Sequence, residues 1–270
     1  MSNNIPTVLT IAGSDPSGGA GIQADLKTLS AAGVYGAAAI TALTAQNTTG
    51  VSAIAPVDPA FVKKQIKAVL SDIRIDVIKL GMLFDDKIAR AVAPFLQNHK
   101  VICDPVMMSG TGESLEGGNL FKALGEEIFP ACDFITPNVF ELETICGKTG
   151  LAAAKAVAII MERFPKLSGI VVKGGHVDMD KKTVRDRLFL RENHRIKTEE
   201  FRHERVKTKN LHGTGCTFAA AFAAFLARKF TVREAFIGAS DLTAKIISAS
   251  AGYKLGSGHG PLMHHLVCAK

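Results

Sequence analysis

The stretch that decides the fold runs from Asp76 to Val106 and reads DVIKLGMLFDDKIARAVAPFLQNHKVICDPV. It begins and ends with short apolar runs, DVIKLG and VICDPV, which have the length of buried strands. Between them, FDDKIARAVAPFLQNHK spaces its apolar residues as one face of an amphipathic helix does. A strand, a helix and a second strand in this order predict a βαβ unit with two parallel strands.

The same alternation continues along the whole chain. Four further apolar runs are predicted strands: VLTIAG (8–13), GAAAITAL (36–43), DFITPN (133–138) and GIVVKGG (169–175). Residues 183–201 alternate as a β-hairpin does, and helices are predicted over 217–228 and 232–251. Because no linker or internal repeat interrupts the pattern, we expect one domain over residues 1–270, an α/β fold with a mainly parallel central sheet and a small added β-hairpin.

Polar residues or glycines follow each of the six predicted strands. They are Ser14-Asp15, Gln46-Asn47, Gly81-Met82, Asp104, Asn138 and Lys173-Gly174. One such residue is explained by an ordinary loop, since loops are polar. Open parallel sheets, however, bind their ligands outside the carboxyl ends of the strands. Six such ends together favour a binding crevice at this edge of the sheet.

The composition narrows the function classes. The net charge of +7 favours anionic ligands, but the chain has no tryptophan and two tyrosines, and the basic residues between Lys181 and Lys209 are mixed with acids as in a solvated hairpin. We therefore expect no nucleic-acid partner. The five cysteines are odd in number and lack C-x-x-C spacing, which favours neither a disulfide framework nor a zinc site. With no signal peptide and no membrane span in the pattern, we expect a cytoplasmic protein.

Two phosphate-binding patterns fail on inspection. The tripeptide Gly147-Lys148-Thr149 resembles the end of a Walker loop, but Leu142 stands where that loop needs a glycine. GAGIQA, residues 19–24, matches G-x-G-x-x-A after the first strand, yet residues 34–57 contain no carboxylate to bind a ribose. The sequence therefore does not support a nicotinamide oxidoreductase.

The motif HGTGC, His212 to Cys216, enters a helix rich in alanine and phenylalanine. Glycines let successive N–H groups face one point, and the positive end of the helix dipole adds to the attraction for an anion. An ordinary glycine-rich helix cap explains the motif equally well at this point. We interpret His212 as a hydrogen-bonded loop residue rather than a metal ligand.

Lys173 favours the anion site, and two carboxylates nearby suit a metal ion that would accompany a phosphate. Lys173, followed by two glycines at the end of a buried strand, suits a phosphate oxygen better than it suits packing. Asp104 and Glu141 supply carboxylates that could hold Mg²⁺ through water. The alternative for both is capping, because Asp104 precedes a proline and Glu141 lies in a first helical turn.

Beyond these patterns, whole blocks of the chain resemble a known family. TIAGSDPSGGAGIQADLKTLSAAGVYGAAAITALTAQNTTGV resembles the N-terminal signature of the bifunctional hydroxymethylpyrimidine kinase/phosphomethylpyrimidine kinase family of thiamine biosynthesis, which belongs to the ribokinase-like superfamily. IKLGML, DPVM, ITPNVFELE, VVKGGH, HGTGCTFAAAFAA and GSGHGPLMHH resemble the later family blocks, in the right order. The resemblance covers essentially the whole chain and implies a three-layer ribokinase-like sandwich.

The resemblance also implies the activity and the site. The expected reaction is ATP-dependent phosphorylation of an aminopyrimidine alcohol and then of its monophosphate, with ATP and Mg²⁺ as cofactors and a homodimer as the assembly. The implied catalytic residues are Cys216, Lys173, Gly213 and Gly215. The implied substrate-binding residues are Gln46, Asp25, Gly13, Met82 and Val106. The implied ATP-binding residues are Asn138, Glu141, Lys173, Thr208 and Thr214, and the implied metal ligands are Asp104 and Glu141.

Two parts of the sequence differ from the pattern of related enzymes. Residues 107–115 read MMSGTGESL and depart from the usual family block, so we assign no contact to this loop. Cys216 stands where most ribokinase-like enzymes carry a catalytic aspartate. We hypothesise that a thiol, unlike a fixed carboxylate, serves both a neutral alcohol and a charged phosphate acceptor. A pyridoxal or pyridoxine kinase and a non-catalytic pyrimidine-binding protein are the alternatives.

Overall fold

The computed structural model describes residues 5–107, 119–175, 182–193 and 195–267, so most of the loop 107–115 lies outside the described residues. One nine-stranded sheet organises this part of the chain. Its strands are β1 Thr7–Ser14, β2 Tyr35–Asn47, β3 Gly50–Pro56, β4 Val77–Leu80, β5 Lys100–Cys103, β6 Phe134–Ile135, β7 Gly169–Val172, β8 Thr183–Glu192 and β9 Arg195–Glu204. The helices are α1 Gly21–Ala31, α2 Pro59–Leu70, α3 Asp86–Val92, α4 Leu120–Ala123, α5 Val139–Cys146, α6 Ala153–Arg163, α7 Thr214–Ala227 and α8 Val232–Ser250.

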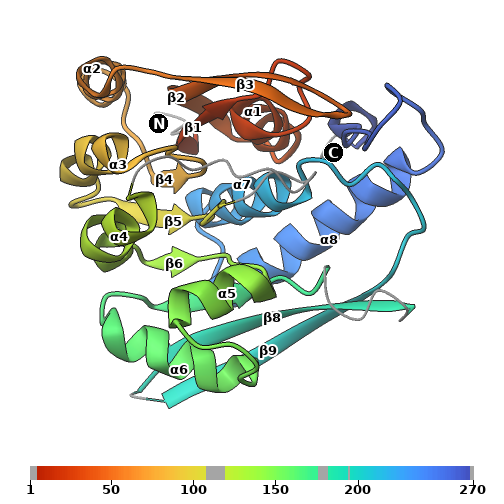
Figure 1. Ribbon diagram of the computed structural model, residues 1–270. Helices are drawn as coiled ribbons and strands as arrows, with labels where there is room; N and C mark the ends of the chain where they lie inside the picture. The colour runs from red at the N-terminus through yellow and green to blue at the C-terminus, as the bar shows by residue number, and fades with distance from the viewer. Residues whose placement is uncertain (1–4, 108–118, 176–181, 194, 268–270) are drawn as a thin grey trace.

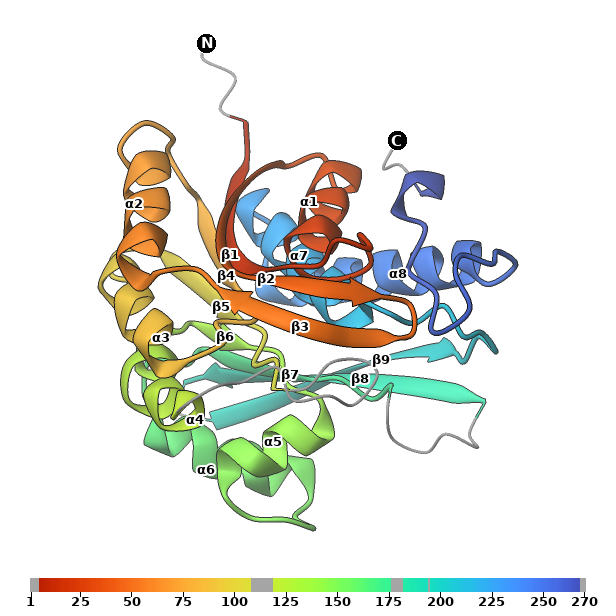
Figure 2. The same cartoon turned by 45° about the horizontal axis from the view of Figure 1, so that its top comes forward.

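The strand order is β3-β2-β1-β4-β5-β6-β7-β8-β9, and the pairs from β2 to β7 are all parallel. The antiparallel strands β3 and β9 form the two edges (Figure 2). The chain leaves β1 for β2 on one side and later returns to β4 on the other. The strand order therefore reverses at β1, and such a switch point opens a crevice at the carboxyl ends of the strands.

Helices cover both faces of the sheet, which gives the three layers (Figure 1). Because strand side chains alternate between faces, Leu9 and Ile11 of β1 pack with helices α2 to α6, whereas Val8 packs with α1, α7 and α8. The sheet lies between these two apolar clusters. None of the helices among the described residues is long and apolar enough to cross a membrane.

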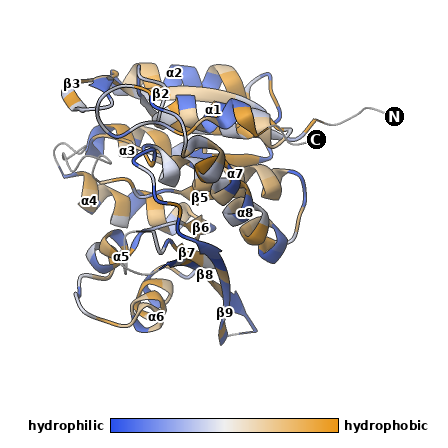
Figure 3. Ribbon diagram, turned by 90° about the vertical axis from the view of Figure 1, so that its right-hand side faces the viewer, coloured by the Kyte–Doolittle hydropathy of each residue, from blue (hydrophilic) through white to orange (hydrophobic). Residues whose placement is uncertain are grey.

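The structure confirms the α/β fold and adds to the expected strands. Strand β3, with its small residues and terminal proline, was not predicted. It pairs with β2 and carries β2 on to Asn47, past the predicted end at Leu43. The predicted hairpin is β8–β9, which continues the main sheet beyond β7. Its outer strand is largely hydrophilic, as an exposed edge strand usually is (Figure 3).

Candidate active site

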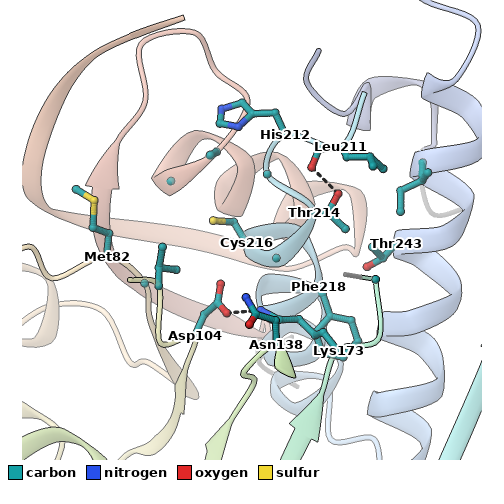
Figure 4. A pocket seen from close by; sticks show the side chains of 18 of the residues that line it. Met82, Asp104, Asn138, Lys173, Leu211, His212, Thr214, Cys216, Phe218 and Thr243 are labelled. Carbon is teal, nitrogen blue, oxygen red and sulfur yellow. Dashed lines mark hydrogen bonds and ion pairs between the residues drawn. The ribbon is translucent and has the colours of Figure 1, made fainter. Parts of the chain in front are cut away.

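A cavity of about 570 Å³ lies at the carboxyl ends of the parallel strands. It extends from β1 and β2, across the ends of β4, β5 and β7, to helix α8. The N-terminus of α7 forms its centre (Figure 4). In the close-up, Cys216 lies between Met82 on one side and Thr243 on the other. We divide the cavity at Cys216 into two compartments, one next to β1 and β2 and the other next to α8.

Glycines shape the turn that starts α7. Gly213 has a φ of 85°, and a Cβ there would stand 1.8 Å from the Gly19 carbonyl oxygen, so only glycine fits. The turn is closed by Thr214, whose hydroxyl donates to the Leu211 carbonyl at 2.7 Å. The next two N–H groups, of Gly215 and Cys216, have no carbonyl one turn earlier within the helix. They are available to an anion at the positive end of the dipole.

Lys173 and Asp104 form a close pair beneath this turn. The Lys173 ammonium lies 2.7 Å from Asp104 Oδ1, which also accepts a hydrogen bond from Thr136 at 3.2 Å. Asp104 is 1% exposed, and its second oxygen, Oδ2, has no partner among the described residues. A Cβ on Gly215 would stand 3.3 Å from the lysine nitrogen and 3.6 Å from Oδ2. The glycine thus keeps space open above both charges.

Glu141 and Asn138 hold the adjacent wall through a capping box at the start of α5. Asn138 Oδ1 accepts from the Glu141 N–H at 2.9 Å, and Glu141 Oε2 accepts from the Asn138 N–H at 2.8 Å. The carboxyl of Glu141 is buried near Asp104 and Lys173. Burial, with the nearby charge of Asp104, outweighs Lys173 and raises the pKa of Glu141 to about 7. The capping alternative is therefore correct for Glu141, and it does not exclude a second role.

The thiol of Cys216 is half-buried at the junction of the compartments. Burial raises its pKa to about 11, although the Lys79 cation and a hydrogen bond from the Gly21 N–H act in the opposite direction. The thiol is therefore neutral near pH 7. Gly21 begins α1, so the sulfur lies beside two helix N-termini, its own and that of α1.

A buried ion pair lies under the thiol. Lys79 of β4 is fully buried, and its ammonium lies 2.9 and 3.0 Å from the two carboxylate oxygens of Asp25 on α1. Thr10 of β1 donates to the same carboxylate at 2.5 Å. Burial would lower the pKa of Lys79, but Asp25 and the nearby Cys216 and Asp104 hold it above its usual value. Lys79 lines the cavity floor, whereas Asp25 lies behind it.

The compartment next to β1 and β2 combines apolar side chains with polar ones, among them one amide. Met82 and Val106 line it, and Gly13 lies so close that a Cβ would meet the Met82 methyl at 2.5 Å. Gln46 projects from the part of β2 that β3 supports. Its amide Nε2 lies 3.3 Å from His212 Nε2, and this histidine nitrogen lies 2.8 Å from Asp15 Oδ2.

The compartment next to α8 carries two buried hydroxyls. Ser240 and Thr243 line it, and neither hydroxyl has a partner among the described residues. Phe218 and Ile247 supply apolar walls. Thr208, predicted from the resemblance to contact the nucleotide, instead lines a neighbouring cavity together with Lys207 and Lys254.

The cavity brings together nearly all of the predicted site residues. Those that line it are Cys216, Lys173, Gly213, Gly215, Gln46, Gly13, Met82, Val106, Asn138, Glu141, Thr214 and Asp104. Asp25 and Thr208 do not line it. Sequence reasoning missed Lys79, although a lysine inside the apolar strand VIKL was a usable signal. It also missed Ser240 and Thr243, which look like ordinary polar residues of a helix.

Comparisons with known proteins find relatives along almost the whole chain. The family model for phosphomethylpyrimidine kinase matches residues 15–263. The hydroxymethylpyrimidine/phosphomethylpyrimidine kinase of Escherichia coli K12 is 39% identical over 264 residues, which cover 95% of this chain and 96% of the relative. The thiamine biosynthesis bifunctional protein ThiED of Geobacter sulfurreducens is 42% identical over 266 residues, 96% of this chain but 52% of the relative, so the chain spans about half of that longer protein.

Among solved structures, the pyridoxal kinase of Staphylococcus aureus in complex with AMP-PCP and pyridoxal has a TM-score of 0.84 and 30% identity, covering 97% of this chain and 94% of that one. This similarity confirms the ribokinase-like fold. Together with the family match, it shows that the chain is an ATP-dependent kinase. The family model extends over most of the chain, and the E. coli relative matches along almost its whole length. The chain therefore belongs to the phosphomethylpyrimidine kinase family.

Proposed function

We propose that the protein uses ATP to phosphorylate 4-amino-5-hydroxymethyl-2-methylpyrimidine to its monophosphate and then to the diphosphate, for thiamine biosynthesis. One observation carries the proposal: a single cavity joins a compartment that carries an amide between apolar side chains to a lysine–carboxylate compartment at a helix N-terminus. The first compartment suits a small heteroaromatic ring, and the second suits phosphates. The family membership supports the same reaction.

The aminopyrimidine would occupy the compartment of Gln46, Met82, Val106 and Gly13. A side-chain amide both donates and accepts, so Gln46 can pair with a ring nitrogen and the neighbouring amino group together. Asp25 lies behind the wall of this compartment, so it would affect substrate binding only through Lys79. The acceptor oxygen of the substrate would then lie near Cys216, at the junction.

The nucleotide would occupy the other compartment. Its transferring phosphate would lie between the Lys173 ammonium and the free N–H groups of Gly215 and Cys216, donors that are already in place before the reaction. Asn138 and Thr214 would border the phosphates. The unpartnered hydroxyls of Ser240 and Thr243 would bind the base or the ribose. Thr208 stays a prediction, since it lines the neighbouring cavity.

The carboxylates present fit Mg²⁺. The buried orphan oxygen of Asp104 and the Glu141 carboxyl lie on the phosphate side, and Mg²⁺ commonly uses one or two carboxylates together with waters and substrate phosphates. No cluster of three or more metal-ligating side chains occurs in the described part of the chain, which suits an ion that arrives with the nucleotide. When bound, Mg²⁺ would neutralise phosphate charge.

Cys216 would let one site serve both acceptors. The first acceptor is a neutral alcohol, and the second is a monoester that carries about −1.5 to −2 charge near neutrality. With a pKa of about 11, the thiol has no charge to repel the monoester. A carboxylate at the same position would repel it at short range.

Three wider expectations belong to the same proposal. We propose that residues 1–270 act as a single kinase domain, which the single continuous sheet supports. We propose a cytoplasmic location, which the free state of the cysteines in the described ranges supports. We propose a homodimer on the family resemblance.

A direct test is to incubate the purified protein with Mg-ATP and, separately, the pyrimidine alcohol, its monophosphate, pyridoxal or no acceptor, and to separate the products by chromatography. We expect both pyrimidines to be phosphorylated. Lys173→Met should lower turnover by about 100-fold or more. The matched control is Lys148→Met, because Lys148 is the exposed lysine of the rejected Walker-like tripeptide and should tolerate the change.

The structural similarity to pyridoxal kinase makes pyridoxal the second candidate acceptor. Turnover of pyridoxal alone would agree with the assignment of the nucleotide compartment but would contradict the role of Gln46. Turnover of no acceptor would favour a pyrimidine-binding protein without catalysis.

A further inference from the structure

Asp15, His212 and Gln46 form a hydrogen-bonded chain along the wall of the substrate compartment. Asp15 follows β1, His212 precedes α7 and Gln46 lies on β2, so three separate segments contribute. Asp15 and His212 are 2% and 7% exposed. All three line the cavity, and Gln46 is the most exposed of them. The positions of the hydrogens in this series of hydrogen bonds follow from what each group can donate or accept.

Asp15 is the fixed end of the chain, because it accepts from many donors. Its Oδ1 accepts from the N–H and hydroxyl of Ser17, and its Oδ2 accepts from the N–H groups of Gly19 and Ala20. Burial pushes the pKa of Asp15 upward, but the hydrogen bonds from His212 and Ser17 outweigh it and hold the pKa below its usual value. The carboxylate is therefore ionised and can only accept.

An acceptor 2.8 Å from His212 Nε2 requires that this nitrogen carry a hydrogen. The Gln46 amide faces the same N–H at 3.3 Å with the atom Nε2, and two N–H groups cannot bond to each other. Turning the amide by 180° about Cγ–Cδ places Oε1 opposite His212, where it accepts a share of the same N–H. The histidine thus favours one of the two amide orientations.

Thr44 favours the same orientation from the other end of the amide. Its hydroxyl lies 3.1 Å from the Ser14 carbonyl and 3.1 Å from the second amide atom of Gln46. The single hydroxyl hydrogen goes to the Ser14 carbonyl, which has no hydrogen of its own. The hydroxyl oxygen then accepts from a Gln46 NH₂ group. Both ends of the amide are satisfied only with Oε1 toward His212 and Nε2 toward Thr44.

We propose that Asp15 and His212 are positioning residues that fix the orientation of the Gln46 amide and make the site select a 4-amino over a 4-oxo pyrimidine. This proposal rests on the proposed function. With the amide fixed, its remaining lone pair faces the exocyclic substituent and its remaining N–H faces the ring nitrogen. An amino group with a bare ring nitrogen matches both. A 4-oxo ring, with its carbonyl and ring N–H, meets a like group at both points and would need the opposite orientation.

The experiment measures calorimetric Kd, kcat and KM for the 4-amino pyrimidine alcohol and its 4-oxo analogue in the wild-type protein and in His212→Leu, His212→Gln and Thr44→Val. Leucine removes the N–H and leaves Asp15 its other donors. Glutamine at position 212 can donate to Asp15 with one hydrogen and to Gln46 with the other. Thr44→Val releases the opposite end of the amide and removes the hydrogen bond to the Ser14 carbonyl, but it leaves every hydrogen bond of the Asp15 side chain in place. Melting temperatures identify any variant that fails to fold.

We expect the wild-type protein to prefer the 4-amino ring by about 100-fold or more in kcat/KM. His212→Leu should reduce this preference by about 10-fold or more, Thr44→Val should reduce it less, and His212→Gln should restore most of it. Unchanged preference in both His212→Leu and Thr44→Val would overturn the proposal. An equal loss for both rings would overturn it as well, because a merely structural role predicts that result. Binding of neither ring by the wild-type protein would instead overturn the proposed function, and this proposal with it.

Discussion

Replacing Lys79 by methionine should destabilise the protein strongly, although the two side chains have similar length. The Lys79 ammonium is the partner of Asp25, and both side chains are almost completely buried, at 1% and 0% exposure. Removing the cation leaves a carboxylate in a site from which water is excluded. Thr10 still donates to that carboxylate, but one hydroxyl cannot replace a full positive charge.

The size of the effect follows from this geometry. Breaking a buried ion pair by removing one partner costs about 3–5 kcal/mol of unfolding free energy. A chain of 270 residues has an unfolding entropy of about 0.6 kcal/mol per degree. A loss of about 4 kcal/mol therefore lowers the melting temperature by about 7 °C. The loss should grow as the pH rises above about 4, because the unpaired Asp25 escapes the penalty only while it is protonated.

The assay is urea unfolding at several pH values together with thermal melts. Lys245→Met is the matched control, because Lys245 pairs with Asp241 on the solvent side of α8, with 64% of its side chain exposed. That change should cost less than about 0.5 kcal/mol. The double variant Lys79→Met/Asp25→Leu should recover much of the stability, since no buried charge remains.

A loss below about 1 kcal/mol in Lys79→Met, or a loss that does not depend on pH, would refute this reasoning. Either result would mean that Asp25 is already neutral in the folded protein or that water reaches the pair. A double variant no more stable than the single one would show that the cost comes from packing rather than from charge.

Three further changes test other parts of the site. Gly215→Ala should fold with a melting temperature within about 2 °C of the wild-type value. It should raise the KM for ATP about 10-fold, because the new Cβ stands 3.3 Å from the Lys173 nitrogen. An unchanged KM would contradict the assignment of the phosphates to this turn. Cys216→Asp should lower the second phosphorylation at least about 10-fold more than the first, since a carboxylate repels the charged monoester; equal losses, measured by separate kinetics on each acceptor, would contradict the role of the thiol. Burial lowers the pKa of His264 to about 4. Between about pH 6.5 and 4 the unfolded chain therefore takes up a proton at this residue that the folded chain does not. His264 should lower the free energy of unfolding by about 3 kcal/mol as the pH falls through that range. Urea unfolding of His264→Gln should show a shallower acid decline than the wild-type protein, and parallel curves would show that His264 does not titrate in this way.

Much of the fold was readable from local patterns. Apolar runs the length of a strand alternate with amphipathic helices, and this alternation alone predicts parallel strands with helices on both faces. The carboxyl ends of parallel strands share one edge of the sheet. The residues after the strands, such as Asp104 and Lys173, could therefore be placed together before any contact was known. The glycine turn before α7 was readable for the same reason, because it is a local feature.

The pattern failed where pairing between strands, rather than local preference, decides the structure. Strand β3 contains glycine, serine and proline and has little strand preference of its own, yet it pairs with β2 along most of its length. That pairing extends β2 beyond its predicted end and supports Gln46 above the cavity. An amide expected in a loop after the strand therefore lies on the strand itself.

The sequence by itself determined the type of site and the chemical groups that it brings to the crevice, because both follow from short-range order and from the rule that parallel strands share an edge. Only the tertiary structure decided which groups face each other. Lys79 and Asp25 are 54 residues apart, and His212 and Asp15 are 197 residues apart. Such contacts depend on which strand lies beside which and on how closely α1 and α7 approach. No local pattern encodes that approach, because the packing of the whole sheet sets it.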